Sequence, residues 1–365
     1  MKATKAMPQQ EMKATKAMPQ QEKTKTPRYI ERVSFSSPEE VLQETLGKKF
    51  GQRYLDYRQN YFRSFDADKH GESPDFAHTV TLEFVNRCNL TCDMCYVANH
   101  SFAKATLSLE VVKNLVDQVA EHGKTGLLLG VGSEGLLYKD ICEVIRYANN
   151  AGVMDIILMT NGTLLTAELS DFLVTQEVSR VCISVDAATP ETYETVRGKD
   201  ELEILESNIR GLVAARKKHG SLLPVIRLSF CVLEQNAHEQ IAFREKWDGV
   251  VDYIDYQQVN DFSNVGHEDE VDLNPIGPDE ADRPFCSKPF GYLNVWSNGD
   301  ISPCCTFYGK GLTFGNVKNN TLEEVYDGEA MADLRAQFKG KKEINKVCRV
   351  CLASRENLIG DSIRS

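Results

Sequence analysis

Hydrophobic and polar positions follow two alternating patterns over most of the chain. Short apolar runs, typical of buried strands, are separated by longer stretches with the 3.6-residue period of amphipathic helices. We predict strands at 79–85, 126–131, 154–159, 180–186, 225–233 and 251–259. We predict helices at 108–122, 138–151, 166–175, 190–195, 201–219 and 237–246. This alternation favours parallel strands with right-handed crossovers, so the predicted fold class is α/β, a partial (β/α)6 barrel.

The segments outside this pattern divide the chain further. Residues 1–22 are two copies of MKATKAMPQQE without apolar periodicity, so we expect a disordered, duplicated start. The next segment is expected to be helical, because Ser37 and Pro38 suit an N-cap and the first helical position. Asn298-Gly299 predicts a β-hairpin, and Thr321 is expected to cap a helix over 321–338. The predicted parts are a repeated tail, a helical segment, the barrel, a linker and a small α+β domain, at 1–26, 27–77, 78–261, 262–285 and 286–365.

Composition and charge exclude several classes of function. The chain of 365 residues is 42% apolar and 26% charged, which is usual for soluble proteins, and it has no apolar run long enough to span a membrane. A net charge of −11 argues against a nucleic-acid surface. The start lacks the apolar segment of a secretory signal, so we expect a cytoplasmic protein. Its eleven cysteines are then metal ligands or buried thiols rather than disulfides.

Three of these cysteines follow the first predicted strand directly. Cys88, Cys92 and Cys95 have the spacing C-x3-C-x2-C. Three buried thiols on one helix face are the structural alternative, but Asn, Thr and Asp between them are poor helix formers, and a loop is favoured. A structural zinc site normally takes four protein ligands. Three thiolates on a [4Fe–4S] cluster instead leave one iron open to another ligand.

At the end of a first strand, this motif resembles the cluster loop of the radical S-adenosylmethionine (SAM) family. The resemblance implies a TIM-like partial barrel with a [4Fe–4S] cluster on these cysteines and SAM on the open iron. It also implies reductive cleavage of SAM to a 5′-deoxyadenosyl radical, with an electron donor such as flavodoxin or ferredoxin. Further positions that match the family at the ends of the predicted strands are Met94, Gly132, Ser133, Glu134, Asn161, Ser184 and Arg197.

The resemblance assigns a role to several of these positions. The backbone beside Met94 is expected to face the adenine, and Glu134 to accept a hydrogen bond from the SAM amino group. Ser133 stands where the family has glycine. Ser184 is expected on the ribose or methionine part. Arg197 is expected near the SAM carboxylate, with a surface salt bridge as the alternative.

A second group of cysteines lies in the C-terminal part, with the spacing C-x17-C-C-x42-C-x2-C. Its members are Cys286, Cys304, Cys305, Cys348 and Cys351. A zinc ribbon is one interpretation. The region also resembles the SPASM and shortened twitch modules, and five cysteines suffice for one fully ligated auxiliary [4Fe–4S] cluster, as in the aminocyclitol dehydrogenase type. That resemblance implies the ligands Cys286, Cys304, Cys348 and Cys351, with Cys305 as a substitute for Cys304.

The proposed substrate is a small polar, carbohydrate-like molecule. Inward-facing polar residues are expected on the barrel strands, including Cys182 with Ser184, and Cys231 with Arg227. Further residues expected to line the site are Asn236, Glu239, Gln257, Gln258 and Asn260.

Hydrogen abstraction from this substrate leads to oxidation, with the auxiliary cluster taking the second electron, or to epimerisation. In an epimerisation Cys231 would return hydrogen, with Cys182 and Cys305 next in order. The alternative, which the residue type favours, is that Cys231 is a small buried packing residue. A peptide-modifying maturase of the SPASM type is the first alternative, disfavoured because 27–77 is short and reads as helical. The second alternative is a non-enzymatic iron–sulfur or zinc module.

Overall fold

The computed structural model describes residues 32–65, 74–99, 103–259, 267–271, 274–277 and 283–354. The predicted tail and Asn260 lie outside these described residues, as does part of the predicted linker. No helix in the described ranges is long and apolar enough to cross a bilayer.

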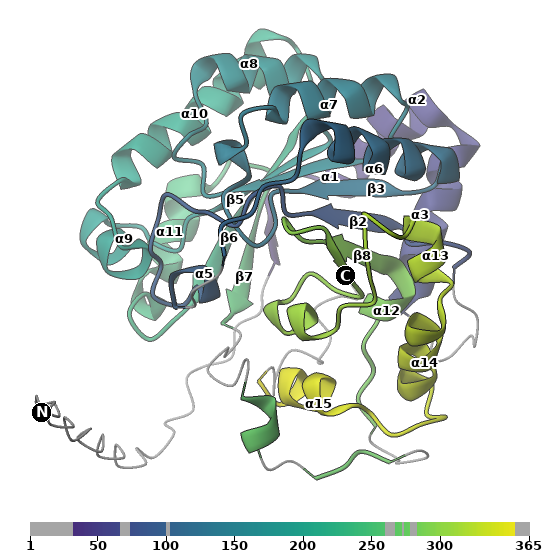
Figure 1. Cartoon of the computed structure of the whole chain (residues 1–365). Coiled ribbons are helices and arrows are strands. Elements are labelled where there is room, and N and C mark those ends of the chain that lie inside the picture. Colours follow the sequence, from purple (N-terminus) through teal and green to yellow (C-terminus); the bar gives the residue numbers. More distant parts are fainter. Residues whose placement is uncertain are drawn as a thin grey trace, which may run out of the picture.

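One ten-stranded sheet runs through the described part of the chain, in the order β1-β7-β6-β5-β4-β3-β2-β8-β9-β10 (Figure 1). Its strands are β1 (Arg32–Ser34), β2 (Thr79–Leu82), β3 (Gly126–Leu129), β4 (Ile156–Thr160), β5 (Arg180–Ser184), β6 (Val225–Val232), β7 (Tyr253–Gln258), β8 (Tyr292–Val295), β9 (Asp300–Ser302) and β10 (Gly315–Asn316). The six predicted strands are confirmed as β2 to β7, and each pairs in parallel with its neighbours in sequence.

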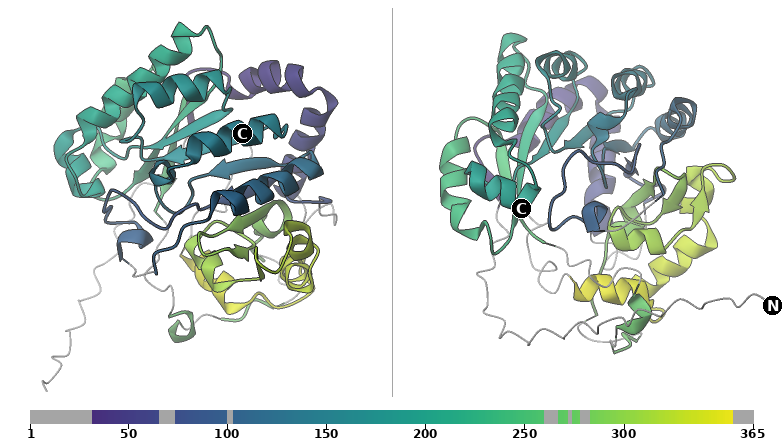
Figure 2. Two further views of the ribbon diagram at one scale, coloured as in Figure 1. Left: turned by 45° about the horizontal axis from the view of Figure 1, so that its top comes forward. Right: turned by 60° about the vertical axis from the view of Figure 1, so that its left-hand side comes forward.

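Helices follow the strands and cover the outer face of the sheet (Figures 1 and 2). They are α6 (Leu109–His122), α7 (Ile141–Asn150), α8 (Ala167–Thr175), α9 (Pro190–Arg197), α10 (Leu202–Lys218) and α11 (Gln240–Trp247). Ser108, Thr166 and Thr189 begin three of them as N-caps, each accepting a hydrogen bond from a backbone N–H three residues later. The predicted alternation of strands and helices is therefore confirmed. It forms an open, partial α/β barrel with the helices on its outer face.

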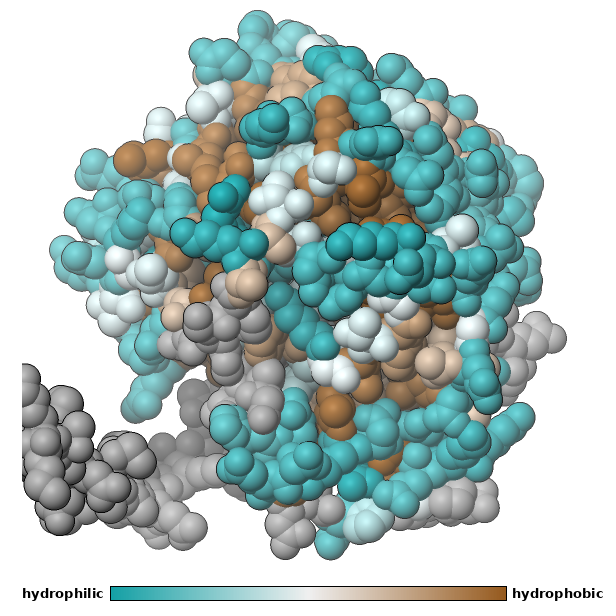
Figure 3. Space-filling model, viewed as in Figure 1, coloured by the Kyte–Doolittle hydropathy of each residue, from teal (hydrophilic) through white to brown (hydrophobic). Residues whose placement is uncertain are grey.

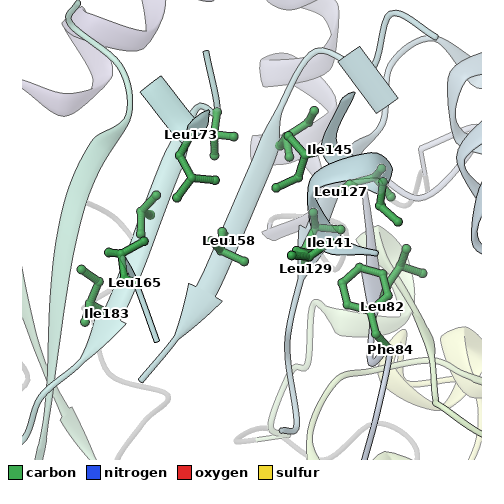
Figure 4. Packing of buried hydrophobic residues seen from close by; sticks show 14 of the residues in the cluster. Leu82, Phe84, Leu127, Leu129, Ile141, Ile145, Leu158, Leu165, Leu173 and Ile183 are labelled. Carbon is green, nitrogen blue, oxygen red and sulfur yellow. The ribbon is translucent and has the colours of Figure 1, made fainter. Parts of the chain in front are cut away.

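Alternate residues of each strand face the helices and form the main core. Leu82, Leu127 and Leu158 belong to one buried apolar cluster, together with Ile145 and Leu173 of the helices (Figure 4). The residues between them point to the opposite, inner face of the sheet. Several of these inner residues are polar, namely Thr81, Ser184, Arg227, Ser229 and Gln257. Burial of the outer face, worth about 25 cal/mol per Å² of apolar surface, fixes the register and leaves a polar interior.

The N-terminal helices close the end of the barrel at which the strands begin. They are α1 (Pro38–Leu42), a π-helical turn at Gln43–Gly47, α2 (Lys48–Phe50) and α3 (Gln52–Phe65). Tyr57 of α3 is buried and donates a 2.8 Å hydrogen bond to Asp155, which lies just before β4. Arg180 Nη2 lies 3.3 Å from the same carboxylate, and Ser179 donates to it. This fully buried carboxylate thus has a charged partner and two hydroxyl donors, as burial of a charge requires.

Two local features differ from the sequence-based expectation. The described part of the segment expected to be helical begins with β1, which pairs antiparallel with β7 through Arg32 and Asp255. The three residues of β1 are too few to show a strand pattern in the sequence, and their extended conformation depends on the pairing with β7. The single helix expected over 321–338 is two helices, α13 (Leu322–Tyr326) and α14 (Glu329–Phe338), because Gly328 is extended (ψ 159°) after the C-cap Asp327 and is the N-cap of α14. Thr321 caps the first as predicted, in a capping box with Glu324.

The predicted hairpin exists, but it does not stand alone. β8 and β9 pair antiparallel as expected, while β8 also pairs in parallel with β2. The C-terminal segment therefore extends the barrel sheet at its β2 edge, as both views in Figure 2 show. Four helices complete the described residues of this part, namely α12 (Lys288–Gly291), α13, α14 and α15 (Lys346–Ala353). Hydrophilic residues dominate the face shown in Figure 3, with apolar residues visible between them.

Replacement of Tyr57 by Phe is expected to lower the free energy of unfolding by about 1.5–3 kcal/mol, because a buried hydrogen bond to a charged group is lost. Tyr147→Phe is the matched control, since Tyr147 donates a hydrogen bond of the same 2.8 Å length to Asp117 at an exposed position. That control is expected to change stability by no more than about 0.5 kcal/mol. Thermal unfolding of the holoprotein under anaerobic conditions measures both variants. Equal shifts would contradict a supporting role for the buried network.

Stability is expected to fall below pH 6.5 because of His78. Burial is the main cause that lowers the pKa of this imidazole from 6.5 to about 3. Between pH 6.5 and 3 the unfolded chain therefore binds a proton at this imidazole and the folded chain does not. This contribution to the free energy of unfolding is complete above pH 6.5 and declines by up to about 1.4 kcal/mol per pH unit as the pH falls towards 3. His78→Asn should flatten this dependence, and His238→Asn, at an exposed position, should not. Unfolding midpoints measured from pH 7.5 to 5 test this, and parallel slopes in all three proteins would refute it.

Candidate active site

The first three cysteines lie in a loop between β2 and the short helix α5 (Tyr96–Asn99), so the predicted loop is confirmed. Cys92 is buried, and Cys88 and Cys95 are partly buried. Burial is the main cause that raises the pKa of Cys88 and of Cys95. Without a metal these thiols are therefore neutral, and ligation to iron would deprotonate them.

Asn161, which follows β4, fixes one side of this loop. Its side-chain amide donates a 2.8 Å hydrogen bond to the Asn89 side chain and lies 3.8 Å from Cys88 Sγ. Its oxygen accepts from the backbone and hydroxyl of Thr163, and Asn89 also donates to that hydroxyl. The structure thus brings Asn161 to the cysteine loop, where it orders the residue next to Cys88.

Glu134 is buried, and its carboxylate is already engaged within the chain. Oε1 accepts from the Thr160 hydroxyl at 2.8 Å and from the Leu136 backbone N–H at 3.0 Å. Oε2 accepts from the Asn161 backbone N–H at 2.7 Å. Burial raises the pKa of Glu134, while these hydrogen bonds lower it. A carboxylate has about four acceptor sites, so at most one remains for a ligand, and the main contacts of Glu134 join the ends of β3 and β4.

Gly132 and Ser133 pack against the same cysteine loop. Ser133 donates a hydrogen bond to the backbone oxygen of Val85, at the start of the loop. Gly132 has φ +88°, and its carbonyl accepts a 3.1 Å hydrogen bond from Tyr96. A Cβ at Gly132 would lie 2.7 Å from the Tyr96 hydroxyl and 2.8 Å from Glu83 Oε1, so both its conformation and its surroundings require glycine.

Arg197 is buried, and the surface salt bridge considered from the sequence is not what the structure contains. Its Nη2 lies 2.7 Å from Asp186 Oδ2, and its Nη1 donates to Cys92 Sγ at 3.4 Å. Asp186 follows β5 and also accepts a 2.6 Å hydrogen bond from the Cys231 backbone N–H. An ion pair thus connects the first cysteine loop to the end of β6.

The remaining predicted site residues lie near the same strand ends. Ser184, Met94 and Cys231 are partly exposed, and Ser184 is the register partner of Ser229. Cys182 is buried lower on β5, opposite Arg227. Burial raises the pKa of the Cys231 thiol, which therefore keeps its hydrogen at neutral pH.

Four of the further positions expected to line the site belong to the described residues, and their surroundings differ. Asn236 and Glu239 are buried and engaged by the chain itself. Asn236 donates to the backbone oxygens of Asp186 and Cys231, and Glu239 accepts from Thr189. Gln257 is exposed, and Gln258 is partly exposed.

Four C-terminal cysteines line one pocket. They are Cys286, Cys304, Cys348 and Cys351, and the rest of the lining is mainly apolar, including Leu334, Phe338 and Leu352. Cys305 is not among the lining residues. Burial raises the pKa of Cys304 to about 12 and that of Cys348 well above its usual value.

Two neighbouring residues shape this pocket. A Cβ at Gly309 would lie 2.8 Å from Cys304 Sγ, so glycine lets the chain pass this sulfur. The Asn345 side chain caps α15 and also donates to Cys348 Sγ at 3.3 Å.

Glu83 and Lys310 join the two cysteine regions, and the sequence analysis did not single them out. Glu83 follows β2 and is buried; its Oε2 accepts from the Ser297 backbone at 3.0 Å and from the Ser297 hydroxyl at 2.7 Å. Lys310 Nζ lies 3.5 Å from Glu83 Oε1 and 4.4 Å from the Trp296 ring centroid. The sequence did contain a signal for Glu83. This acidic residue directly follows an apolar strand and alternates with Thr79 and Thr81, so it is expected on the inner face of the sheet.

An aromatic contact strengthens the same junction. Tyr96, the residue after Cys95, stacks on Phe307 with ring centroids 4.0 Å apart. Phe307 lies three residues after Cys304 and begins the 3₁₀ turn Phe307–Gly311 that carries Lys310. The loop of the first cysteine group therefore packs directly on the loop of the second.

The residues present fit iron–sulfur clusters in both places. The first loop offers three thiols, and the second pocket offers four. The buried guanidinium of Arg197 against Cys92 suits a thiolate, because a buried cation requires negative partners. No three His, Cys, Asp or Glu side chains in the described ranges converge on a point for a single metal ion. A four-iron cluster takes one ligand at each iron, so its ligands do not meet at one point.

Comparison with known families gives two matches. The model of the radical SAM superfamily matches residues 82–230. The SPASM model, an iron–sulfur cluster-binding domain, matches residues 286–352. These ranges contain the first and the second cysteine group respectively.

Curated relatives resemble parts of the chain. The AdoMet-dependent heme synthase of Methanosarcina barkeri is 36% identical over 139 residues, which is 38% of this chain and 39% of the relative. The subtilosin biosynthesis protein AlbA of Bacillus subtilis is 25% identical over 277 residues, 68% of this chain and 59% of the relative. The matched part spans about two fifths to just over half of the first relatives.

Solved structures share the fold. The crystal structure of Streptococcus suis SuiB bound to S-adenosylmethionine has a TM-score of 0.57 at 16% identity, covering 74% of this chain and 70% of that one. At this identity the likeness shows the fold alone, a partial α/β barrel followed by a smaller C-terminal domain. The predicted cofactors, SAM and two iron–sulfur clusters, agree with both family matches. This chain therefore contains a radical SAM domain over residues 82–230 and a C-terminal SPASM domain over residues 286–352.

Proposed function

We propose that this chain is a radical SAM oxidoreductase that removes hydrogen from a small polar, carbohydrate-like substrate at the open end of the barrel. The observation that carries the proposal is the C-terminal pocket, where four cysteines surround one space. Four protein ligands satisfy a four-iron cluster completely, which leaves no iron for a substrate. Such a site suits the transfer of an electron, and oxidation of a substrate radical requires an electron acceptor.

The residues of the first site have two roles: some bind the cluster, and others order the loop that carries these ligands. Cys88, Cys92 and Cys95 are the proposed ligands of the SAM-binding cluster. When bound there, SAM supplies the radical that takes a hydrogen atom from the substrate. Glu134 and Asn161 order the loop around it through the hydrogen bonds described above.

The inner face of the barrel supports a polar substrate. Ser184, Arg227 and Cys231 are partly exposed on this face, and Gln257 is exposed. Leu128, Ile157 and Met159 supply an apolar floor on the central strands, and they too are partly exposed. This combination of a few polar groups on an apolar surface is typical of small-molecule sites.

Peptide modification is the second candidate. It is supported by the alignment with AlbA, a bacteriocin biosynthesis protein, over 68% of this chain. A solved structure of SuiB bound to the precursor peptide SuiA shares the fold with a TM-score of 0.53. Both candidates use the same two cluster sites, and they differ in the substrate that the open end of the barrel accepts.

Iron content tests the proposed ligands. The reconstituted chain should hold about eight Fe, and the variant with Cys88, Cys92 and Cys95 changed to Ala should hold about four. Cys304→Ala should also lose the auxiliary cluster, whereas Cys305→Ala should keep it, because Cys305 lies outside the pocket. Cys142→Ala, a partly buried thiol of α7, is the control and should keep all eight. Zinc in the C-terminal site, or equal losses in Cys304→Ala and Cys305→Ala, would contradict this assignment.

The product distinguishes oxidation from epimerisation. After hydrogen abstraction, oxidation removes one further electron and one proton, so the product is lighter by two hydrogens. Epimerisation returns a hydrogen atom, most directly from the protonated thiol of Cys231. We expect loss of two hydrogens by mass spectrometry, and Cys231→Ala should keep most product formation. An unchanged mass with solvent deuterium at one carbon, and a Cys231→Ala variant that cleaves SAM without product, would replace oxidation by epimerisation. Turnover of a peptide but of no sugar-like compound would favour the second candidate.

A further inference from the structure

A buried ion pair touches one of the proposed cluster ligands. Arg197 ends α9, and its guanidinium contacts Asp186 at 2.7 Å and Cys92 Sγ at 3.4 Å. Its Nε donates to the backbone oxygen of Val185 at 3.4 Å. Each of the three nitrogens of the guanidinium thus has a partner within the protein: the Asp186 carboxylate, the Val185 backbone oxygen or the Cys92 sulfur.

The surrounding backbone holds this contact in place. Thr91 and Asp93, on either side of Cys92, donate backbone hydrogen bonds to the carbonyls of Arg197 and Val196 at 3.3 and 3.2 Å. Gly198 packs so closely on Thr91 that a Cβ there would lie 2.2 Å from the Thr91 hydroxyl. The cysteine loop is therefore docked on the C-terminal end of α9, which keeps the Arg197 backbone next to Cys92.

Asp186 occupies an unusual backbone conformation to complete the pair. Its φ is +66°, a region that non-glycine residues rarely adopt and that costs of order 1–3 kcal/mol. Its two carboxylate oxygens have separate partners, because Oδ2 meets Arg197 and Oδ1 accepts from the Cys231 backbone N–H at 2.6 Å. This strained position is maintained at the end of β5, next to the cysteine loop.

We propose that Arg197 and Asp186 act as positioning residues that set the reduction potential of the cluster on Cys88, Cys92 and Cys95. The inference rests on the proposed function, since it requires that cluster. Hydrogen bonds to the ligand sulfurs are among the factors that set the potential of an iron–sulfur cluster. A cation beside Cys92 stabilises the more negative, reduced state and raises the potential. The carboxylate of Asp186 opposes it and moderates the effect.

This inference assigns Arg197 a different partner from the SAM carboxylate expected from the sequence. The two roles give different results in the absence of SAM. A residue that binds only the SAM carboxylate leaves the potential of the SAM-free cluster unchanged when it is replaced. A residue that donates to Cys92 changes that potential before SAM is added.

The experiment is a redox titration of the holoenzyme without SAM, followed by electron paramagnetic resonance. The signal of the first cluster is identified by its loss in the triple Cys→Ala variant. Arg197→Gln should lower the midpoint potential, and Asp186→Asn should raise it. Asn keeps an acceptor for the Cys231 N–H and tolerates positive φ, so this variant removes little besides the charge. Arg197→Lys keeps the charge without the planar fork and should lie between the native protein and Arg197→Gln.

A second buried pair in the same chain supplies the matched control. Arg180 and Asp155 are 3.3 Å apart near the start of the strands, at the end of the barrel opposite the cysteine loop. Arg180→Gln and Asp155→Asn should leave the potential of the first cluster unchanged. Affinity for SAM, measured by equilibrium dialysis in every variant that holds the cluster, provides the second readout.

Opposite shifts in Arg197→Gln and Asp186→Asn support the inference. Shifts of the same sign would mean that both changes merely disturb the loop, and they overturn it. An unchanged potential combined with weaker SAM binding in Arg197→Gln would overturn it in favour of the carboxylate role. Absence of the first cluster from the native chain itself would instead refute the proposed function on which the inference depends.

Discussion

The parallel register of the strands is the constraint on which the rest of the structure depends. From β7 across to β8, each strand pairs in parallel with its neighbour, so their carboxyl ends meet at one edge. The segments after β2, β3, β4 and β5 supply the cysteine loop, Glu134, Asn161 and Asp186 respectively. The pairing of the strands therefore brings residues that lie far apart in the sequence to the same edge of the sheet.

The pairing of β8 with β2 extends the same constraint to the C-terminal domain. It places Ser297 beside Glu83, and the turn that carries Lys310 beside Tyr96. Glu83 is held by Ser297 and Lys310 and lies against Gly132, so this one buried carboxylate touches both domains. A charge buried in this way requires its partners, and its partners belong to the second cysteine region. The two cluster sites are consequently parts of one packed unit.

The sequence was sufficient for the features that depend on local pattern. Strands β2 to β7, the helix cap at Thr321 and the two cysteine groups all carry a signal in consecutive residues. Features that depend on long-range pairing carried none. β1 has three residues and exists through β7, and the position of β8 in the main sheet depends on β2.

At the site too, the sequence predicted which residues are present but not which residues they contact. Glu134 and Arg197 were found as residues, but their partners were not, because a motif does not show that Glu134 joins β4 or that Arg197 reaches Cys92. The positive φ of Asp186 was equally hidden, since nothing in a sequence distinguishes a strained Asp from a relaxed one. Cys304 and Cys305 are adjacent and both partly buried, so only the fold shows that Cys304 lines the pocket and Cys305 does not.

The central claim is that the first cysteine loop holds a cluster with one iron open to SAM, while the C-terminal cluster is closed. Electron paramagnetic resonance of the reduced holoenzyme, recorded with and without SAM, tests it most directly. SAM should change the signal of one cluster only, and that signal should be missing when Cys88, Cys92 and Cys95 are replaced by Ala. Two signals that both ignore SAM, or a SAM-sensitive signal that persists in the triple variant, would contradict the account.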